Sequence, residues 1–509
     1  MSNQNTYHRA KIWQIGFFAF NNTATNLYMF FMFFISYYAT GMLGLGVVLV
    51  STLMTAMRIW DAFTDPIAGY ILDKTDGKLG KNRPFIIAGN IIMMISCIIM
   101  FKFVYKSPQA LRLLLFILVY SVYIIGYTLQ CVVTKSAQTC LTNDPKQRPY
   151  FTIFDGSYNV VLFAGMQALV SQVWAIKYGG FNSEFFNTFL LFTITVSAFL
   201  SILAIIGLWT KDRTEYFGFG KPQLITFKDY WQVIKNNRAI QMLIISACSD
   251  KLFLTLQSNS IVTVMLYGII CGNYALSGQV SLYMTIPSVI IIILGMKFIA
   301  SNRGQKNALL FGSIGSIIFS LLLMFLFIFG NPKSMSFTSL NFFTIAFMLL
   351  WILIKGFSGI SGNIVIPMTA DCADYETYRS GKYVPGLMGT LFSCVDKIIS
   401  SFATTIVGLM IAMIGFKTTQ PQPDTPYSNE IFIITMICMF ILPIIGWLIN
   451  LVAMKFYPLT KEKMEEIQNT IAEIKAKRLI NKKPISYIIK SYLLDSLYCK
   501  YKIFLIFNM

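Results

Sequence analysis

The chain has 509 residues, of which 56% are hydrophobic and only 12% are charged. An apolar fraction this large is more than a water-soluble surface accommodates, so the composition argues against a soluble enzyme and indicates a protein embedded in a bilayer. The net charge of +19 is therefore interpreted as basic loops on the cytoplasmic side of a membrane, and no nucleic-acid partner is expected.

The residues that carry much enzyme chemistry are scarce. His8 is the only histidine, which rules out Ser-His-Asp triads and histidine proton relays. The nine cysteines are scattered without a CxxC pair, and the chain has no GxxxxGK[ST] phosphate loop. The sequence therefore predicts neither a cofactor nor an enzyme, and an integral-membrane transferase is only a weak alternative.

Long apolar runs predict about twelve membrane-spanning helices, each long enough to cross about 30 Å of hydrocarbon. The expected spans are 12–40, 44–72, 85–105, 111–141, 150–176, 186–209, 239–270, 276–299, 307–329, 338–368, 384–416 and 430–456. The expected organisation is an N-terminal six-helix bundle (1–210), a cytoplasmic central loop (211–238), a C-terminal six-helix bundle (239–456) and a cytoplasmic tail (457–509). Two such halves are typical of transporters built from parallel repeats.

Basic residues gather in alternate loops, such as 74–83 and the central loop 211–238. By the positive-inside rule these loops are cytoplasmic, so both termini are expected inside a bacterial-type inner membrane. In the tail, 459–478 has the apolar spacing of an amphipathic helix. The basic and aromatic segment 480–509 is expected either on an anionic membrane surface or as a disordered extension.

Two carboxylates lie inside the second predicted span. Asp61 and Asp65 are four residues apart, so they lie on one helix face, about 6 Å apart along its axis. Ionisable groups at membrane depth are costly and are functional candidates by default. Asp61 and Asp65 are therefore candidate functional residues, and Arg58, one turn earlier on that face, can neutralise one of them. The alternative is a structural ion pair with Arg58 and a neighbouring lysine.

This block carries a family resemblance. The stretch Arg58-Ile-Trp-Asp61-Ala-Phe-Thr-Asp65-Pro66-Ile-Ala-Gly69, followed by Gly80-Lys81-Asn82-Arg83-Pro84, resembles the signature of the glycoside, pentoside and hexuronide cation symporters, the melibiose permease group. The stretch Asp371-Cys-Ala-Asp374-Tyr-Glu-Thr-Tyr378 and the lysine at 397 resemble a second family region. The resemblance implies a major-facilitator bundle that works by alternating access. It also implies a cation held by the helix-two carboxylates, and Lys81, Arg83, Asp371 and Asp374 are expected to form a cytoplasmic gate.

The sequence departs from that family in its binding positions. Where the family commonly has an acidic residue in helix one, this chain has the neutral Asn22, Thr25 and Asn26. The helix-four carboxylate of the melibiose permease aligns with Cys131, and its helix-five arginine aligns with Asp155 or Gly156. Both the cation site and the solute site are therefore expected to be altered.

Lys135 follows Cys131 by one helical turn and lies near the predicted depth of Asp65 and Asp155. We expect these three residues to form a charged cluster with Asp61 and Arg58, in which Lys135 takes the electrostatic place of sodium. A proton is then favoured as coupling ion, although sodium and an uncoupled facilitator stay open. The alternative is that Lys135 snorkels to the headgroups and Asp155 caps its helix.

The solute site is expected between the two halves. Its candidate residues are Asn22, Thr25, Asn26 and Gln130 in the first half and Trp351, Lys355 and Lys397 in the second. Lysines can hold a carboxylate or sugar hydroxyls, and Trp60 or Trp351 can stack on the apolar face of a sugar. The predicted function is cation-coupled symport of a glycoside, oligosaccharide or uronide by a monomer in the lipid bilayer. The alternative is a facilitator or exchanger of a non-sugar or lipid-like solute.

Overall fold

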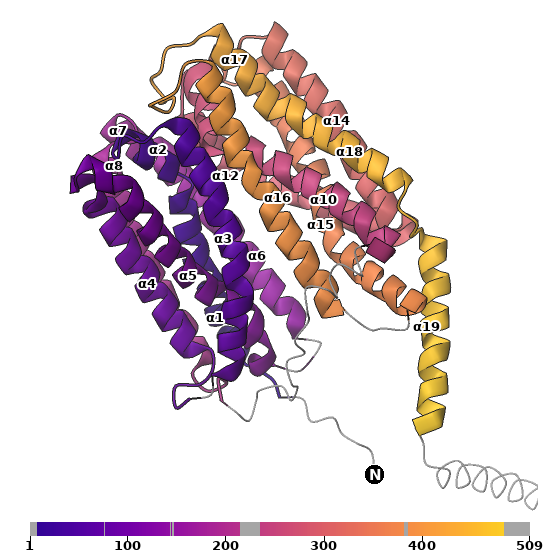
Figure 1. The fold of residues 1–509 in the computed structure, drawn as a ribbon. Helices are drawn as coiled ribbons and strands as arrows, with labels where there is room; N and C mark the ends of the chain where they lie inside the picture. The colour runs from indigo at the N-terminus through magenta and orange to yellow at the C-terminus, as the bar shows by residue number, and fades with distance from the viewer. Residues whose placement is uncertain are drawn as a thin grey trace, which may run out of the picture.

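The computed structural model describes residues 8–75, 77–142, 144, 147–213, 235–380 and 385–482. All regular secondary structure in these ranges is helical, and the helices form an elongated bundle (Figure 1). A helix satisfies its backbone hydrogen bonds within one segment, which hydrocarbon requires of any spanning element. The expected all-α fold is confirmed.

The first half contains six spans. They are α1 (Ile12–Met32) with the short α2 (Ile35–Gly41), α3 (Val47–Lys74), α4 (Arg83–Lys102), α5 (Gln109–Leu141), α6 (Arg148–Ala168) continued by a π-helical stretch and α7 (Ala175–Tyr178), and α8 (Ser183–Leu208). Local signals set several of these ends. The Asn182 side chain accepts a hydrogen bond from the Phe185 N–H at the start of α8, and Pro84 lies in the first turn of α4.

The second half also contains six spans and ends in a tail helix. They are α10 (Arg238–Gln257) with α11 (Ser260–Thr263) and a π-helical stretch to Ile270, α12 (Ala275–Gly295) running through a π-helical stretch into α13 (Ser301–Arg303), α14 (Gln305–Phe329), α15 (Phe342–Ser380), α16 (Pro385–Met413), and α17 (Asn429–Met436) joined to α18 (Leu442–Lys455); α19 (Lys461–Lys482) follows. The predicted tail helix is thus present, whereas 214–234 of the central loop and 483–509 of the tail lie outside the described residues.

Eleven helices of the described chain are long and apolar enough to cross a membrane. The remaining span is α1, whose 21 residues include Gln14, Asn21, Asn22 and Asn26. Counting α1, the described chain has the twelve spans that the sequence predicts.

The helices within each half pack closely through small residues. A methyl group added at Gly89 of α4 would lie 2.8 Å from the Gly126 carbonyl oxygen of α5, and one added at Gly312 of α14 would lie 2.8 Å from the Phe357 carbonyl oxygen of α15. In lipid, association depends on this kind of close backbone approach rather than on the hydrophobic effect. These contacts hold the helices of each half together and so fix the positions of the side chains that each half contributes to a shared site.

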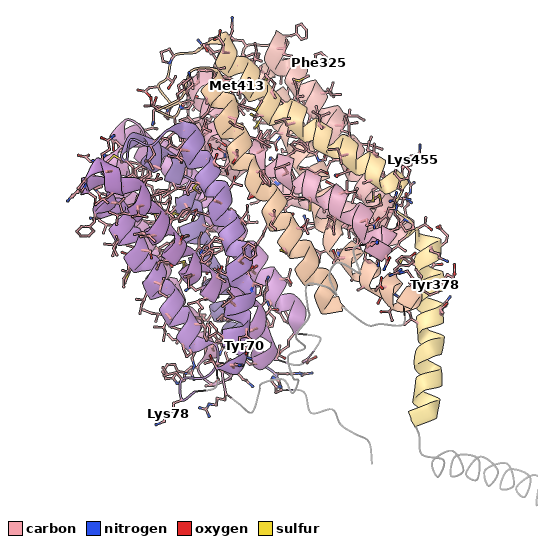
Figure 2. The ribbon with its side chains drawn as sticks, viewed as in Figure 1. Tyr70, Lys78, Phe325, Tyr378, Met413 and Lys455 are labelled. Carbon is pink, nitrogen blue, oxygen red and sulfur yellow. The ribbon has the colours of Figure 1, made fainter. Side chains whose placement is uncertain are left out.

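The two ends of the bundle differ in how the halves meet. The basic end is defined here as the end where α1 begins and α19 lies; it carries Lys78, whereas Phe325 and Met413 lie at the opposite end (Figure 2). Near the opposite end the halves are joined directly, because the Val47 N–H donates to the Lys417 carbonyl oxygen (2.9 Å). Toward the basic end the helices of the two halves splay apart (Figure 1).

The pairs α3 with α16 and α6 with α12 form the seam between the halves. In the first pair the Thr55 hydroxyl donates to the Ser401 carbonyl oxygen (2.8 Å), and in the second Gln167 Nε2 donates to Ser277 Oγ (3.0 Å). The seam therefore places side chains of α3 opposite those of α16, which is where the candidate site lies.

The first span of each half is interrupted about two-thirds of the way along its length. The chain leaves regular helix between α1 and α2 at Phe33 and Phe34, and between α10 and α11 at Ser258 and Asn259. The two breaks touch, because the Ser260 hydroxyl donates to the Phe33 carbonyl oxygen (2.7 Å). Matching breaks in corresponding helices are typical of transporters built from repeats.

Candidate functional site

One lysine joins the two carboxylates of α3 across the seam. Lys397 of α16 places its Nζ 2.5 Å from Asp65 Oδ2 and 3.2 Å from Asp61 Oδ2. Asp61 is 2% exposed, whereas Asp65 and Lys397 are partly exposed. The four-residue spacing of the carboxylates aims both at one point, as the sequence predicts, and the ammonium group from the other half fills that point.

Further polar groups surround Asp61. Arg58 Nη1 lies 3.8 Å from Asp61 Oδ2, and the Thr128 hydroxyl of α5 donates to Asp61 Oδ1 (3.2 Å). With both aspartates ionised, their two negative charges balance the two positive charges of Arg58 and Lys397, so the cluster has no net charge. Neutrality is what makes a buried set of charges tolerable, since an unpaired charge at this depth is costly.

The thiol of Cys131 lies in the same neighbourhood. It is close enough to Asp61, Asp65 and Lys397 to interact electrostatically, and it contacts the Tyr127 hydroxyl. No group of three His, Cys, Asp or Glu side chains in the described residues is arranged to hold a metal ion. The role of Asp61 and Asp65 as cation ligands stays a prediction, and in this conformation their common partner is an ammonium group.

The structure does not assemble the expected cluster of Asp65, Lys135 and Asp155. Asp65 pairs with Lys397, the Lys135 side chain is exposed, and Asp155 accepts a hydrogen bond from Asn22 Nδ2 (2.6 Å). Nor does Asp155 cap its helix, because it lies two turns after the first residue of α6. Equal depth in the membrane was the basis of that prediction, and depth does not determine which way a side chain points around its helix.

The polar candidate residues of the first half, on α1 and α5, divide into two groups. Asn22 and Asn26 are partly exposed and face α6, where Asn26 Nδ2 donates to Asn159 Oδ1 (2.7 Å). Thr25 and Gln130 are fully buried, and the Thr25 hydroxyl donates to Gln130 Oε1 (2.8 Å). In this conformation Asn22 and Asn26 tie α1 to α6 and stay partly exposed, whereas Thr25 and Gln130 tie α1 to α5.

In the second half, Lys355 of α15 lies beside the break between α10 and α11. Its Nζ donates to Gln257 Oε1 (2.8 Å) and lies 4.8 Å from the centroid of the Trp351 ring. Trp351 is 7% exposed and stacks on Phe347. The two candidate residues Trp351 and Lys355 therefore lie together, as their spacing of one helical turn predicts.

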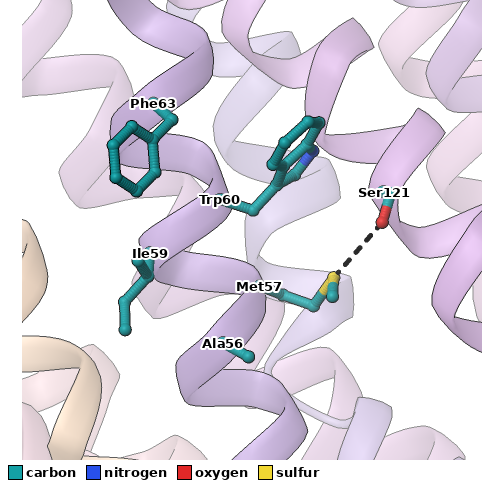
Figure 3. Close-up of a pocket in the computed structure, with 6 residues that line it drawn as sticks. All are labelled: Ala56, Met57, Ile59, Trp60, Phe63 and Ser121. Atoms are coloured by element: carbon teal, nitrogen blue, oxygen red, sulfur yellow. Dashed lines mark hydrogen bonds between the residues drawn. The ribbon is translucent and has the colours of Figure 1, made fainter.

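Trp60 lies elsewhere, on an apolar groove between α3 and α5 (Figure 3). The groove has a volume of about 340 Å³ and is lined by Ala56, Met57, Ile59, Trp60, Phe63 and Ser121. The one hydroxyl among them, of Ser121, donates to the Ile117 carbonyl oxygen of its own helix (2.8 Å) and also lies 3.6 Å from the Met57 sulfur. The groove carries no charge, and its lining is almost entirely apolar apart from the Ser121 hydroxyl and the Trp60 indole N–H, so it suits a lipid chain better than a sugar and gives no support to stacking of a sugar on Trp60.

The loop after α3 is held by a residue that the sequence analysis did not single out. Asp212, which follows α8 and is fully buried, accepts hydrogen bonds from the backbone N–H groups of Asn82 and Arg83 (2.9 Å each). Arg83 Nε lies 3.5 Å from Asp212 Oδ2. Gly80 has φ +85° and packs against Asp212 so closely that a side chain would collide with it. The sequence signal that could have identified Asp212 is an acidic residue just beyond a span, within an otherwise basic segment.

The other expected gate residues lie on the second half. Asp374 of α15 accepts a hydrogen bond from Gln468 Nε2 of α19 (2.6 Å), and Asp371 lies one turn away on the same helix. The tail helix α19 is thus bonded to the basic end of α15. Lys81 and Arg83 belong to the first half and Asp371 and Asp374 to the second, so their gating role stays a prediction for another conformation.

Replacing Asp212 by asparagine is expected to loosen the loop 77–83. The substitution removes the anion that Arg83 faces, and breaking a buried ion pair costs about 3–5 kcal/mol. We expect a lower melting temperature and faster tryptic cleavage at Lys78 in the purified protein. Asp424→Asn, at an exposed position of the opposite end, is the matched control. Unchanged melting and cleavage would show that Asp212 does not anchor the loop.

The geometry defines a class of protein. Twelve spans in two halves, interrupted first helices, and an ion-pair cluster across the seam are features of a secondary transporter. The chain matches the family model described as MFS/sugar transport protein over residues 17–461, and it belongs to that family. It is therefore a multi-pass membrane transport protein and not an enzyme, as the sequence predicts.

Curated relatives include the glucuronide carrier protein homolog of Escherichia coli K12 (24% identity, covering 90% of this chain and 93% of the relative) and the isoprimeverose transporter of Lactiplantibacillus pentosus (22%, 84% and 84%). The inner membrane symporter YicJ of Escherichia coli is similar at 23% identity, covering 87% and 90%. These matches bear out the predicted family and the inner-membrane location.

Solved structures share the fold at low identity. The nucleoside transporter NupG superposes with a TM-score of 0.58 at 13% identity, covering 88% of this chain and 99% of that one. A bacterial homologue of the lysosomal transporter Spinster, in an inward-facing and unoccupied conformation, gives 0.55 at 13% identity, covering 90% and 98%. At this identity the likeness concerns the fold alone.

Proposed function

We propose that the protein carries a sugar-like solute into the cell together with a proton, by alternating access between its two halves. The observation that supports this most directly is the Lys397 ammonium group held between Asp61 and Asp65 across the seam. A contact between the halves that depends on charge is one that protonation can weaken. Binding of the coupling ion and movement of the halves are then linked through the same three side chains.

The orientation follows from the basic loops. We place the basic end, with both termini, in the cytoplasm, because loops rich in lysine and arginine stay on that side. The halves are joined near the opposite end and splay apart at the basic end, so the conformation is inward-facing. The solute then contacts Asn22 and Asn26 of one half and Lys355 of the other, and the transporter works as a monomer in the lipid bilayer.

The solute class is supported by the family and by the names of the relatives. They are described as carriers of a glucuronide and of isoprimeverose, and these descriptions belong to those proteins. Asparagine amides, a lysine and a tryptophan are also groups that bind hydroxyl-rich rings. A glycoside, oligosaccharide or uronide is therefore the proposed solute.

The test is transport by the purified protein in vesicles. Uptake of radiolabelled glycosides and uronides is measured with and without an imposed ion gradient, and downhill exchange of the same solutes is measured in parallel. We expect accumulation only with the gradient. Asp61→Asn and Asp65→Asn should each abolish accumulation and leave exchange. Normal accumulation by both variants would show that the two carboxylates are structural and would overturn the coupling mechanism.

A further inference from the structure

Lys355 of α15 is held differently from Lys397 of α16. Lys397 lies between two carboxylates, whereas the contacts of Lys355 are a neutral amide oxygen and an aromatic ring. Within the described part of the chain, no carboxylate lies at ion-pair distance from Lys355. A cation at membrane depth without a counter-charge is costly, and such residues mark solute or ion pathways by default.

The groups around Lys355 are fixed in place. Gln257 Nε2 donates to the Met439 carbonyl oxygen (2.8 Å), so its Oε1 is held toward the lysine. Gln257 is the last residue of α10, directly before the break at Ser258. Trp351 lies one turn before Lys355 and is held by Phe347. The ammonium group is therefore oriented by neutral partners, which leave its charge uncompensated.

The charges nearby do not supply the missing anion. Asp61 and Asp65 are already balanced by Lys397 and Arg58. Asp250 is two turns before Gln257 on α10, where its Oδ2 accepts a hydrogen bond from the Ser361 hydroxyl. Asp396 lies on α16 beside Lys397, and Lys251 is an exposed cation on α10. A negative charge next to Lys355 must therefore come from outside the described chain.

We propose that the solute supplies this charge, and that the transporter selects a sugar bearing one carboxylate over the neutral glycoside of the same shape. The carboxylate would accept hydrogen bonds from Lys355 Nζ, with Trp351 completing an aromatic wall beside it. This inference rests on the proposed function and narrows it. Lys355 is its specificity-determining residue, acting on the solute and not on the coupling ion.

The experiment compares two matched probes. Binding of p-nitrophenyl β-D-glucuronide and p-nitrophenyl β-D-glucoside to the purified protein is measured by calorimetry, together with the galacturonide and galactoside pair. A charge-assisted hydrogen bond is worth about 1.5–3 kcal/mol, so the acidic member of a pair should bind about 10-fold to 100-fold more tightly. Lys355→Gln should remove this preference, because it should weaken binding of the acidic member about 10-fold to 100-fold more than binding of the neutral member.

Two further variants distinguish a specific role of Lys355 from a loss of folding and from a general effect of removing a positive charge. Lys355→Arg keeps the charge and should retain the preference even if Lys355→Gln is unstable. Lys251→Gln removes an exposed lysine of the same half and should also retain it. Equal binding of both members of each pair, tighter binding of the neutral members, or the same loss in Lys251→Gln and Lys355→Gln would overturn the inference while leaving sugar transport intact. If neither member of any pair binds or is transported, the proposed function fails as well.

Discussion

Replacing Lys397 by glutamine is expected to abolish accumulation of solute. The ammonium group lies within 3.2 Å of the Oδ2 atoms of both Asp61 and Asp65, and an amide cannot neutralise either of them. Arg58 lies farther away, 3.8 Å from Asp61, and 45% of its side chain is exposed, so it cannot take over. Breaking a buried ion pair costs about 3–5 kcal/mol, enough to shift the balance between conformations by more than 100-fold.

The measurement is uptake into vesicles under an imposed gradient, with the exposed Lys417→Gln as control. Lys135→Gln adds a second comparison, because the sequence analysis assigned to Lys135 the position that Lys397 holds in the structure. We expect Lys397→Gln to lose accumulation and Lys135→Gln to keep most of it. The opposite ranking would mean that the ion pair of this conformation does not control coupling.

The spans and the carboxylate pair could be predicted because both are local properties of the sequence. A run of about twenty apolar residues needs only its own length to cross a bilayer. Asp61 and Asp65 share a face because they are four residues apart on one helix. The partner of Asp65 is 332 residues away in the chain, on a helix whose rotation depends on the packing of the whole bundle. Sequence reasoning named Lys397 as a site residue but placed it with the solute.

The breaks in the first helix of each half also depend on tertiary contacts that local sequence does not predict. Phe33 and Phe34 include neither glycine nor proline, so nothing local predicts that helix α1 stops there. The freed Phe33 carbonyl group is satisfied by Ser260 of the other half, which is a tertiary contact. Asp155 was likewise placed by depth alone, and its actual partner, Asn22, depends on how α1 and α6 face each other.

The coupling ion is the second strong prediction. We expect an imposed proton gradient to drive accumulation and a sodium gradient alone to have no effect. Sodium needs several oxygen ligands with a net negative charge, but here Lys397 and Arg58 together already balance the two carboxylates. The position that aligns with the helix-four carboxylate of the melibiose permease carries the thiol of Cys131, a poor ligand for a hard cation. A proton needs no such cage, because protonation of one carboxylate is enough to release Lys397 from it.

Cys131→Asp tests this reasoning by adding the missing ligand. The new carboxylate would lie within electrostatic range of Asp61, Asp65 and Lys397, giving three acidic groups against one ammonium group and the more distant Arg58. Excess negative charge favours binding of a small hard cation, so we expect this variant to respond to a sodium gradient, and Cys131→Ser, which adds no charge, to behave as the unmodified protein does. Strong stimulation of the unmodified protein by sodium alone would contradict the prediction. Equilibration of the solute without accumulation under either gradient would instead identify an uncoupled facilitator, in which the neutral cluster of Lys397 and Arg58 with the two carboxylates serves only to hold the halves together.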